Sequence, residues 1–333
     1  MVELLPVFIQ QYIHSLLEKG RQKSTIKRYL YDLNDFSNWI QKTRQTTEHL
    51  NWKTITAKEL EDFFDELVTK REYNIRTIRR IHSVLRQLAR YQKSIGSTEL
   101  QSIEGIAPPE LLVGPLSPSE WLSHTEALIL MQAVPSENGL SDNQLETFPF
   151  YKERNFFIIR LFLYYGLTLQ EVHQLSMNDI KFEKNELSVS NRIIKLKEED
   201  KQLAYSYFTT IPEPVRPRYH SEEPFMIAFD FKRKTFHWSY DEDSPKRMTM
   251  IAIQKMLRME IKRAGLRKGI SSQTLRHTFI LSNLAKGRSH DNLIELIGYT
   301  SPLSLKRYEN TIAHLTADEA SNLRNFYKMF HET

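Results

Sequence analysis

The stretch from Ser272 to Asn310 constrains the fold of this chain more than any other segment. It starts as an apolar run with one cation, Arg276, near its beginning. A second run with helical periodicity ends at Gly298, and glycine commonly follows the last turn of a helix because it adopts positive φ without steric cost. Tyr308 lies on a third such run. The stretch therefore predicts three consecutive helices, with the arginine on the first and the tyrosine on the third.

The sequence motifs of this stretch resemble those in the catalytic core of the tyrosine recombinases, or phage integrases. That family reads His-x-Leu-Arg-His-Thr-Phe, then Leu-Gly-His-Ser-Ser, then Tyr. This chain reads Gln-Thr-Leu-Arg-His-Thr-Phe over 273–279, Ile-Gly-Tyr-Thr-Ser over 297–301, and then Tyr308. The resemblance implies that Arg276 stands at the position of a phosphate-binding arginine and Tyr308 at that of the nucleophile. In the family this tyrosine attacks a DNA phosphodiester and forms a 3′-phosphotyrosine, and the reaction needs neither ATP nor metal.

Three polar positions of the family's site differ in this chain. Gln273 and Tyr299 stand where the family has histidines, and Thr168 stands where it has its first arginine. Thr168 carries no charge and cannot make the bidentate phosphate contact of an arginine, and Gln273 does not exchange protons near pH 7. Removing one preorganised donor from such a site typically costs about 10²–10³ in rate. We therefore expect a degenerate recombinase site, with Tyr299 packing in the place of the histidine.

The family also uses a lysine on a β-hairpin to protonate the leaving oxygen. The usual Gly-Lys-Gly phrase of that hairpin is missing from this chain. Lys195, Lys197 and Lys201 are all candidates for the role, and an ordinary solvated lysine on a hairpin is an equally good interpretation of each.

Residues 1–93 are expected to form a four-helix domain. Apolar residues recur at helical spacing over 3–19, 24–40, 56–67 and 74–92. Thr56 followed by Glu59 predicts a capping box at the start of the third helix. The phrase Ser-Thr-Ile-Lys-Arg-Tyr-x-x-Asp-Leu-x-x-Phe, which begins at Ser24, resembles the SAM-like core-binding domain that precedes the catalytic domain in the same family.

Positive charge gathers on the fourth of these helices. Between Tyr73 and Lys93 the chain has only cations and no Asp or Glu. An ordinary solvated helix face mixes both signs, so this pattern favours contact with DNA phosphates, whose neutralisation makes affinity depend on salt. With the cations that begin the second helix and those of a basic helix over 250–264, the predicted DNA-contacting residues are Lys23, Lys27, Arg28, Arg76, Arg79, Arg80, Arg86, Arg90, Lys255, Arg258, Lys262 and Arg276.

A linker is predicted for residues 94–120, where glycines and prolines interrupt the periodicity. Residues 121–333 are then expected to form an α+β domain of the integrase catalytic type, with a small sheet from strands over 179–182, 186–190, 193–197 and 204–208. The chain as a whole is predicted to be mainly α. Its last segment, through Leu323 and Phe330, resembles the family's C-terminal helix, which often docks on a neighbouring protomer. Here it mediates self-association or folds back in cis.

Composition excludes several other classes of protein. The chain has no Cys, which excludes disulfides and thiolate metal sites, and its histidines lack metal-ligand spacing. It has no Walker loop, no dinucleotide fingerprint, no apolar run long enough for a membrane span, and no signal-peptide plan at its start. We therefore expect no metal, no small-molecule cofactor and no membrane partner, and a place in a bacterial cytoplasm at the nucleoid.

The resemblance implies a protein that binds double-stranded DNA between its two domains. The leading hypothesis is a sequence-specific DNA-binding regulator with a vestigial active site, similar to the integrase-fold repressors of temperate phages. The alternative is an active site-specific tyrosine recombinase that forms a 3′-phosphotyrosine through Tyr308. A third hypothesis is an accessory subunit that bends DNA for an active partner.

Overall fold

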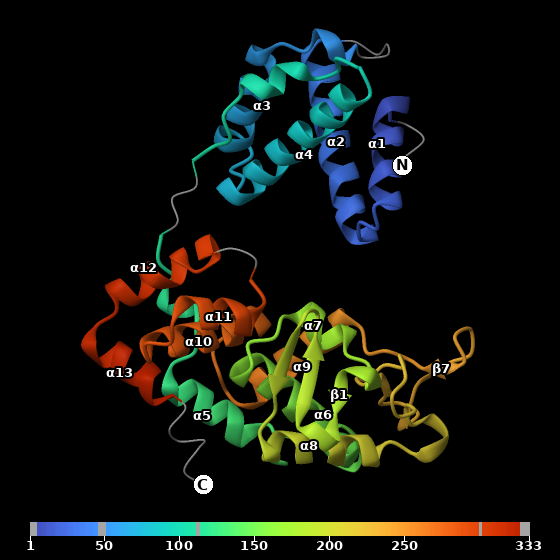
Figure 1. Cartoon of the computed structure of the whole chain (residues 1–333), viewed down its shortest axis with the longest axis vertical. Helices are drawn as coiled ribbons and strands as arrows, with labels where there is room; N and C mark the ends of the chain where they lie inside the picture. The colour runs from blue at the N-terminus through green and yellow to red at the C-terminus, as the bar shows by residue number, and fades with distance from the viewer. Residues whose placement is uncertain (1–4, 46–50, 111–113, 300–301, 327–333) are drawn as a thin grey trace. The chain divides into compact units, whose positions relative to one another are not determined.

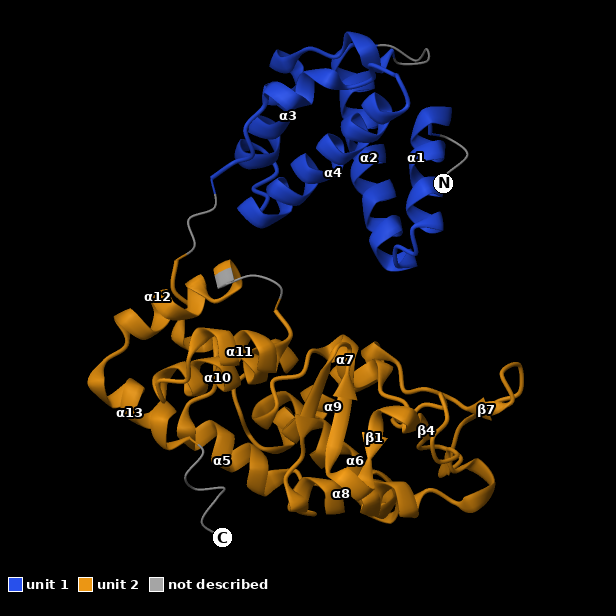
Figure 2. Ribbon diagram, in the orientation of Figure 1, with its two compact units in different colours: residues 1–112 blue, residues 113–333 orange. Residues whose placement is uncertain are grey.

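The computed structural model describes residues 5–45, 51–110, 114–299 and 302–326 of the 333-residue chain. The chain divides into two compact units, residues 1–112 and 113–333 (Figure 2). It is mainly α, with small antiparallel sheets in the second unit (Figure 1). This confirms the predicted fold class.

The first unit is a bundle of four helices, α1 (Val7–Glu18), α2 (Lys23–Thr43), α3 (Ala57–Thr69) and α4 (Ile75–Ser94). Their apolar faces enclose an aromatic centre, where the ring of Phe36 meets those of Phe63 and Trp52 edge-on at centroid distances of 4.9 and 5.3 Å. The predicted capping box is confirmed, because Thr56 and Glu59 exchange side-chain and main-chain hydrogen bonds at the start of α3.

Part of the predicted linker is folded onto the first unit. A 3₁₀ turn, η2 (Gln101–Gly105), lies against α3 and α4, and Leu100 and Ile103 are buried in the core of that unit. The N–H of Leu100 donates to the carbonyl of Trp52 at 3.1 Å. A single 3₁₀ turn has no amphipathic repeat, so the sequence showed only the loss of helical periodicity.

The second unit is built around two buried helices, α6 and α10. Its helices are α5 (His124–Ala133), α6 (Asp142–Tyr164), α7 (Leu169–Gln174), α8 (Glu198–Thr210), α9 (Met250–Arg263), α10 (Ser272–Ala285), α11 (His290–Ile297), α12 (Lys306–His314) and α13 (Ala317–Asn325). α6 packs against α8 and α10, and α10 also packs against α11, α12 and α13. Every residue of α10 from Thr274 to Asn283 is buried, so a polar side chain on this helix must find its partners inside the protein.

A three-stranded antiparallel sheet, β1 (Ile180–Lys181), β2 (Glu186–Val189) and β3 (Arg192–Lys195), lies beside these helices. Two smaller pairs follow, β4 (Phe229–Asp230) with β5 (Thr235–Phe236) and β6 (Trp238–Ser239) with β7 (Ser244–Pro245).

The predicted strand over 204–208 is wrong, because these residues lie in α8. The first turn of that helix contains three acidic residues, Glu198, Glu199 and Asp200. Their negative charges stabilise the helix because its N-terminus carries a partial positive charge. Ala204, Tyr207 and Phe208 are buried at helical spacing. Aromatic residues alternate with small residues over 204–207, and this alternation has the two-residue period of a strand.

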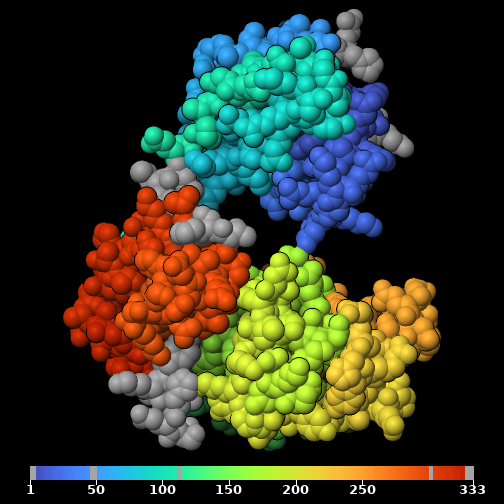
Figure 3. All heavy atoms as spheres, in the orientation of Figure 1, coloured from blue at the N-terminus to red at the C-terminus, as the bar shows by residue number. Residues whose placement is uncertain are grey.

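The C-terminal segment folds back in cis within the described residues. α13 packs on α10, and Leu323 and Phe326 are buried in the core of the second unit. In Figure 3 these last helices, in red, lie against the orange segment of α10 and α11. Phe330 lies outside the described residues. No helix of the described chain is both long and apolar enough to cross a membrane.

Candidate DNA-phosphate site

Arg276 is held inside the second unit by main-chain carbonyls from two separate segments. It lies one turn into α10 and is 3% exposed. Its Nη1 donates to the carbonyl of Gly166, and its Nη2 donates to the carbonyl of Ile297 at 2.9 Å. Glu171 Oε2 lies 3.8 Å from Nη1. The guanidinium is therefore fixed in position before any ligand binds.

The turn between α6 and α7 passes close to α10, and this close approach requires a glycine at position 166. Gly166 has a φ of +63°, a conformation that L side chains rarely adopt, and a Cβ there would lie 2.7 Å from Cε1 of Phe279. With no side chain at Gly166, the turn between α6 and α7 lies directly against Phe279 of α10. This brings Thr168 and Glu171 beside Arg276.

Thr168 caps α7 with its side chain. Its hydroxyl accepts from the N–H of Glu171 at 3.2 Å and donates to Glu171 Oε2 at 2.9 Å, and its own N–H donates to the same carboxylate at 2.7 Å. Burial alone would raise the pKa of Glu171, but hydrogen bonds from Arg192 and Thr168 lower it below its ordinary value. Thr168 therefore holds an ionised carboxylate in place.

A second buried guanidinium, that of Arg192, shares this carboxylate. Arg192 begins β3 at the tip of the β2–β3 hairpin, and its side chain is 9% exposed. Its Nη1 donates to Glu171 Oε1 at 2.6 Å. Arg192 could not be identified from the sequence, because the Gly-Lys-Gly motif is missing there and a single arginine forms no motif of its own.

Tyr308 on α12 and Tyr299 after α11 meet through their hydroxyl groups, with the two oxygens 3.4 Å apart. The guanidinium of Arg276 lies over the ring of Tyr299, 5.2 Å from its centroid. Tyr308 is 5% exposed. Burial is the main cause that raises the pKa of its phenol above the ordinary value, and the contact with Tyr299 raises it further. The positive charge of Arg276 has the opposite, smaller effect. Tyr308 is therefore a neutral phenol at pH 7.

Gln273 and His277 lie one turn apart on α10 and touch through their Nε2 atoms at 2.6 Å. Burial lowers the pKa of His277 to about 4, so its ring is neutral at pH 7. The ring packs edge-on against Tyr308, with centroids 5.5 Å apart. A neutral imidazole from His277 thus lies beside the tyrosine, and Gln273 contributes no charge.

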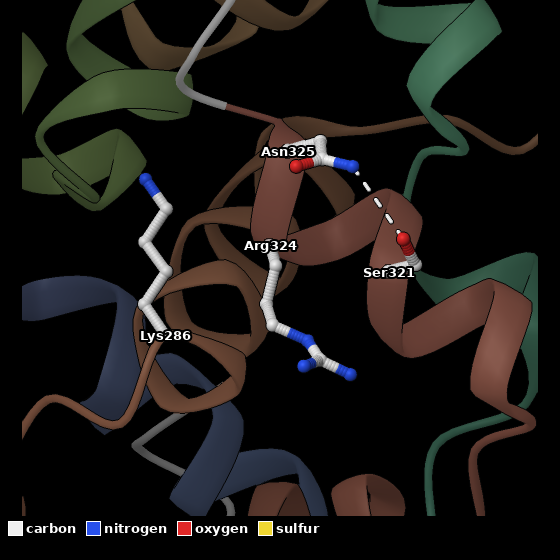
Figure 4. A pocket seen from close by; sticks show the side chains of 4 residues that line it. All are labelled: Lys286, Ser321, Arg324 and Asn325. Carbon is white, nitrogen blue, oxygen red and sulfur yellow. Dashed lines mark hydrogen bonds between the residues drawn. The ribbon is translucent and has the colours of Figure 1, made fainter.

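Two cavities lie on the second unit. One of about 380 Å³ opens beside Gln273 and His277, with the cations Arg267 and Lys268 in its lining. The other, of about 530 Å³, lies between the end of α10 and α13 and is lined by Lys286, Ser321, Arg324 and Asn325 (Figure 4). No predicted site residue lines the second cavity. Among the described residues no cluster of His, Asp and Glu is arranged to hold a metal ion.

The three candidate lysines lie on β3 and at the start of α8, near carboxylates of the β2–β3 hairpin and of that helix. Lys195 is exposed and pairs with Glu186 at 2.5 Å. It lies an odd number of positions from Arg192 on β3, so the two side chains project from opposite faces of the strand. Lys197 lies beyond the strand, 3.9 Å from Glu199, and burial lowers its pKa. Lys201 pairs with Glu198 at 2.6 Å on α8.

The predicted DNA-contacting residues fall into two sets. The exposed ones are Lys23, Lys27, Arg28, Arg76 and Arg90 in the first unit and Lys255, Arg258 and Lys262 on α9 of the second. The others have partners or are half-buried. Arg80 pairs with the buried Asp32, Arg79 donates to the carbonyl of Pro109 at 2.5 Å, and Arg86 is half-buried on α4. Intramolecular contacts therefore engage Arg79 and Arg80.

Known proteins resemble this chain in sequence and in fold. Residues 9–96 match the family model described as phage integrase, N-terminal SAM-like domain. The chain is 22% identical to the tyrosine recombinase XerD of Listeria monocytogenes over 97% of its length and 98% of the relative, and 20% identical to the tyrosine recombinase XerC of Syntrophus aciditrophicus over 88% of each.

Solved structures with the same fold include XerH site-specific recombinase bound to a palindromic difH substrate. It has a TM-score of 0.62 and 16% identity, and the match covers 99% of this chain and 86% of that one. A lambda integrase dimer bound to a COC′ core site matches with a TM-score of 0.57 and 14% identity, over 94% and 97% of the two chains. The fold is that of the integrases.

Proposed function

We propose that the protein is a site-specific tyrosine recombinase that binds duplex DNA, fixes one backbone phosphate at Arg276 and attacks it with Tyr308. The observation that carries this proposal is the contact chain from Arg276 through the ring of Tyr299 to the hydroxyl of Tyr308. The curated relatives named above are tyrosine recombinases of similar length, which supports catalysis over regulation. Such a protein would act at the nucleoid, in a bacterial cytoplasm.

In this reaction the phenolic oxygen of Tyr308 attacks phosphorus, the bond from phosphorus to the 5′ oxygen breaks, and that oxygen leaves with a proton. Arg276 offsets the charge that develops on the phosphate. The raised pKa of Tyr308 means that the phenol must lose its proton as the new bond forms. The net reaction moves this proton to the leaving 5′ oxygen, because His277, which packs against Tyr308, is a weak base with a pKa lowered to about 4.

A second candidate function is that of a DNA-binding regulator that keeps the fold and no longer cleaves. The observation that favours it is the set of groups at the three altered positions, where Thr168, Gln273 and Tyr299 place a hydroxyl, an amide and a phenol instead of the family's arginine and two histidines. Lys195 also projects from the opposite face of the hairpin to Arg192, so it supplies no proton donor beside Arg276.

One experiment separates the two candidates. Duplexes that tile the DNA flanking the protein's own gene are screened by footprinting, and the protected duplex is remade with a nick that traps any covalent adduct. We expect an adduct with the parent protein and none with Tyr308→Phe, which keeps the ring and the DNA affinity. Tyr240→Phe, at a tyrosine that is 91% exposed, serves as the control and should form the adduct.

A footprint without any adduct from the parent protein would instead establish the regulator. If the protein protected none of the duplexes, both candidate functions would be contradicted. An adduct that survives in Tyr308→Phe would assign the nucleophile to another residue.

A further inference from the structure

We propose that Arg192 supplies the second phosphate-binding guanidinium of this site, from the β2–β3 hairpin, and replaces the positive charge that position 168 lacks. The ligand is a phosphodiester group of duplex DNA. The inference rests on the proposed DNA-phosphate function, but it does not require cleavage, because it concerns only how the phosphate is held.

The two guanidinium groups are brought together by one carboxylate. Arg192 Nη1 lies 2.6 Å from Glu171 Oε1, and Arg276 Nη1 lies 3.8 Å from Glu171 Oε2. Both arginine side chains are more than nine-tenths buried. Two cations that share one anion leave a net positive charge in a buried place, where an unbalanced charge is costly. A phosphate would balance it.

The edge of Arg192 that faces away from Glu171 has unused donors. Its Nε and Nη2 are buried and have no hydrogen-bond partner among the described residues. A buried donor without a partner destabilises the protein, because its hydrogen bonds to water are lost and not replaced. The N–H bonds of Nε and Nη2 run parallel along one edge of the guanidinium. This edge can donate two hydrogen bonds to two oxygens of one phosphate. The free edge of Arg192 therefore has the geometry of a bidentate phosphate contact.

The end of α11 holds both arginines in place without a ligand. The carbonyl of Ile297 accepts from Arg276 Nη2 at 2.9 Å, and the guanidinium of Arg192 lies against Gly298. A Cβ on Gly298 would come within 3.1 Å of Cζ of Arg192, and Gly298 has a φ of +70°, so a glycine is needed there. The C-terminal end of a helix carries partial negative charge, which stabilises the nearby cations.

The opposing explanation is that Arg192 only pairs with Glu171 and supports the fold. In that case its removal would lower stability and leave the response to phosphate unchanged. Phosphate binding by Arg192 predicts that the response to phosphate becomes smaller. Arg192 directly follows the exposed turn residues Ser190 and Asn191, so a small movement of the hairpin tip would open its free edge to a ligand.

The test compares Arg192→Gln with Lys195→Gln in the full-length protein, using inorganic phosphate as the probe. Each variant removes one positive charge from the same strand, and Lys195 is exposed. Thermal melting is followed in phosphate and in chloride at equal ionic strength. We expect phosphate to raise Tm of the parent and of Lys195→Gln by several degrees, and to raise Tm of Arg192→Gln much less, since only Arg276 and the general stabilisation by phosphate remain in that variant. Arg192→Lys keeps the positive charge but cannot donate two parallel hydrogen bonds, so phosphate should raise its Tm less than that of the parent. This variant provides the test if Arg192→Gln does not fold.

A phosphate-dependent rise that is as large in Arg192→Gln as in the parent protein, or one that is absent from the parent protein, would overturn the proposal. The adduct experiment is independent of this one. A parent protein that forms no adduct, but whose phosphate response is reduced in Arg192→Gln and not in Lys195→Gln, would contradict cleavage and leave the role of Arg192 intact.

Discussion

The phenolic oxygens of Tyr299 and Tyr308 lie 3.4 Å apart. Tyr299 stands where the resemblance places a histidine, and Tyr308 stands at the nucleophile position. A residue that differs from the family pattern is therefore in direct contact with one that agrees with it. Because Tyr299 also lies under Arg276, it links the cation that would bind a phosphate to the hydroxyl that would attack it.

Tyr299→Phe is expected to lower the pKa of Tyr308. Burial is the first cause of the raised pKa and persists in the variant, whereas the interactions with the Tyr299 hydroxyl are lost. The pKa of Tyr308 should therefore fall and stay above its ordinary value. A pH titration followed by NMR of ¹³Cζ-labelled tyrosine measures this, with Tyr240→Phe as the control. A rise of the Tyr308 pKa would contradict the contact.

Gly166→Ala is expected to destabilise the second unit by about 3 kcal/mol, from left-handed strain and from overlap with the ring of Phe279. Gly265→Ala is a matched control. Gly265 has a φ of +66°, but its Cβ would meet nothing within 4 Å, so only the strain of about 1–2 kcal/mol applies. Urea unfolding of both variants measures the difference. Equal losses would show that the approach to Phe279 does not matter.

Arg76 and Arg90 are the better targets for a salt-dependence experiment on α4. Both are exposed, so their joint replacement by Gln should weaken binding to a random duplex and reduce the slope of log affinity against log salt by about two. Arg80→Gln should instead lower stability, since it leaves Asp32, which is 2% exposed, without its cation. Adding Asp32→Asn to Arg80→Gln should restore most of that loss. An unchanged slope in the Arg76 and Arg90 variant would place the phosphate contacts elsewhere.

Sequence reasoning predicted the elements that have a long periodic signal. It located the four helices of the first unit, the Thr56 cap, and the helices that carry Arg276 and Tyr308. It could not predict contacts made by single side chains across the fold. The pairing of Arg80 with Asp32 and that of Arg192 with Glu171 join distant positions and leave no local pattern.

The same limit explains the strand predicted over 204–208. Alternating aromatic residues have the period of a strand, and the helical period becomes visible only once the acidic first turn of α8 is taken into account.

The stability of the protein is expected to fall between about pH 6.5 and pH 4, and His277 should account for part of that fall. Burial lowers the pKa of His277 from 6.5 to about 4, so between these values the unfolded chain binds a proton that the folded chain does not. Its contribution is therefore constant above about pH 6.5 and is lost as the pH falls, by up to about 3 kcal/mol at pH 4. His277→Phe removes this titration, so the free energy of unfolding should depend less on pH in the variant than in the parent. His14→Phe, at a histidine whose side chain is exposed, is the control for the substitution itself. NMR titration of the imidazole gives the pKa directly, and a His277 ring that titrates near 6.5 in the folded protein would show that its burial against Tyr308 does not hold in solution.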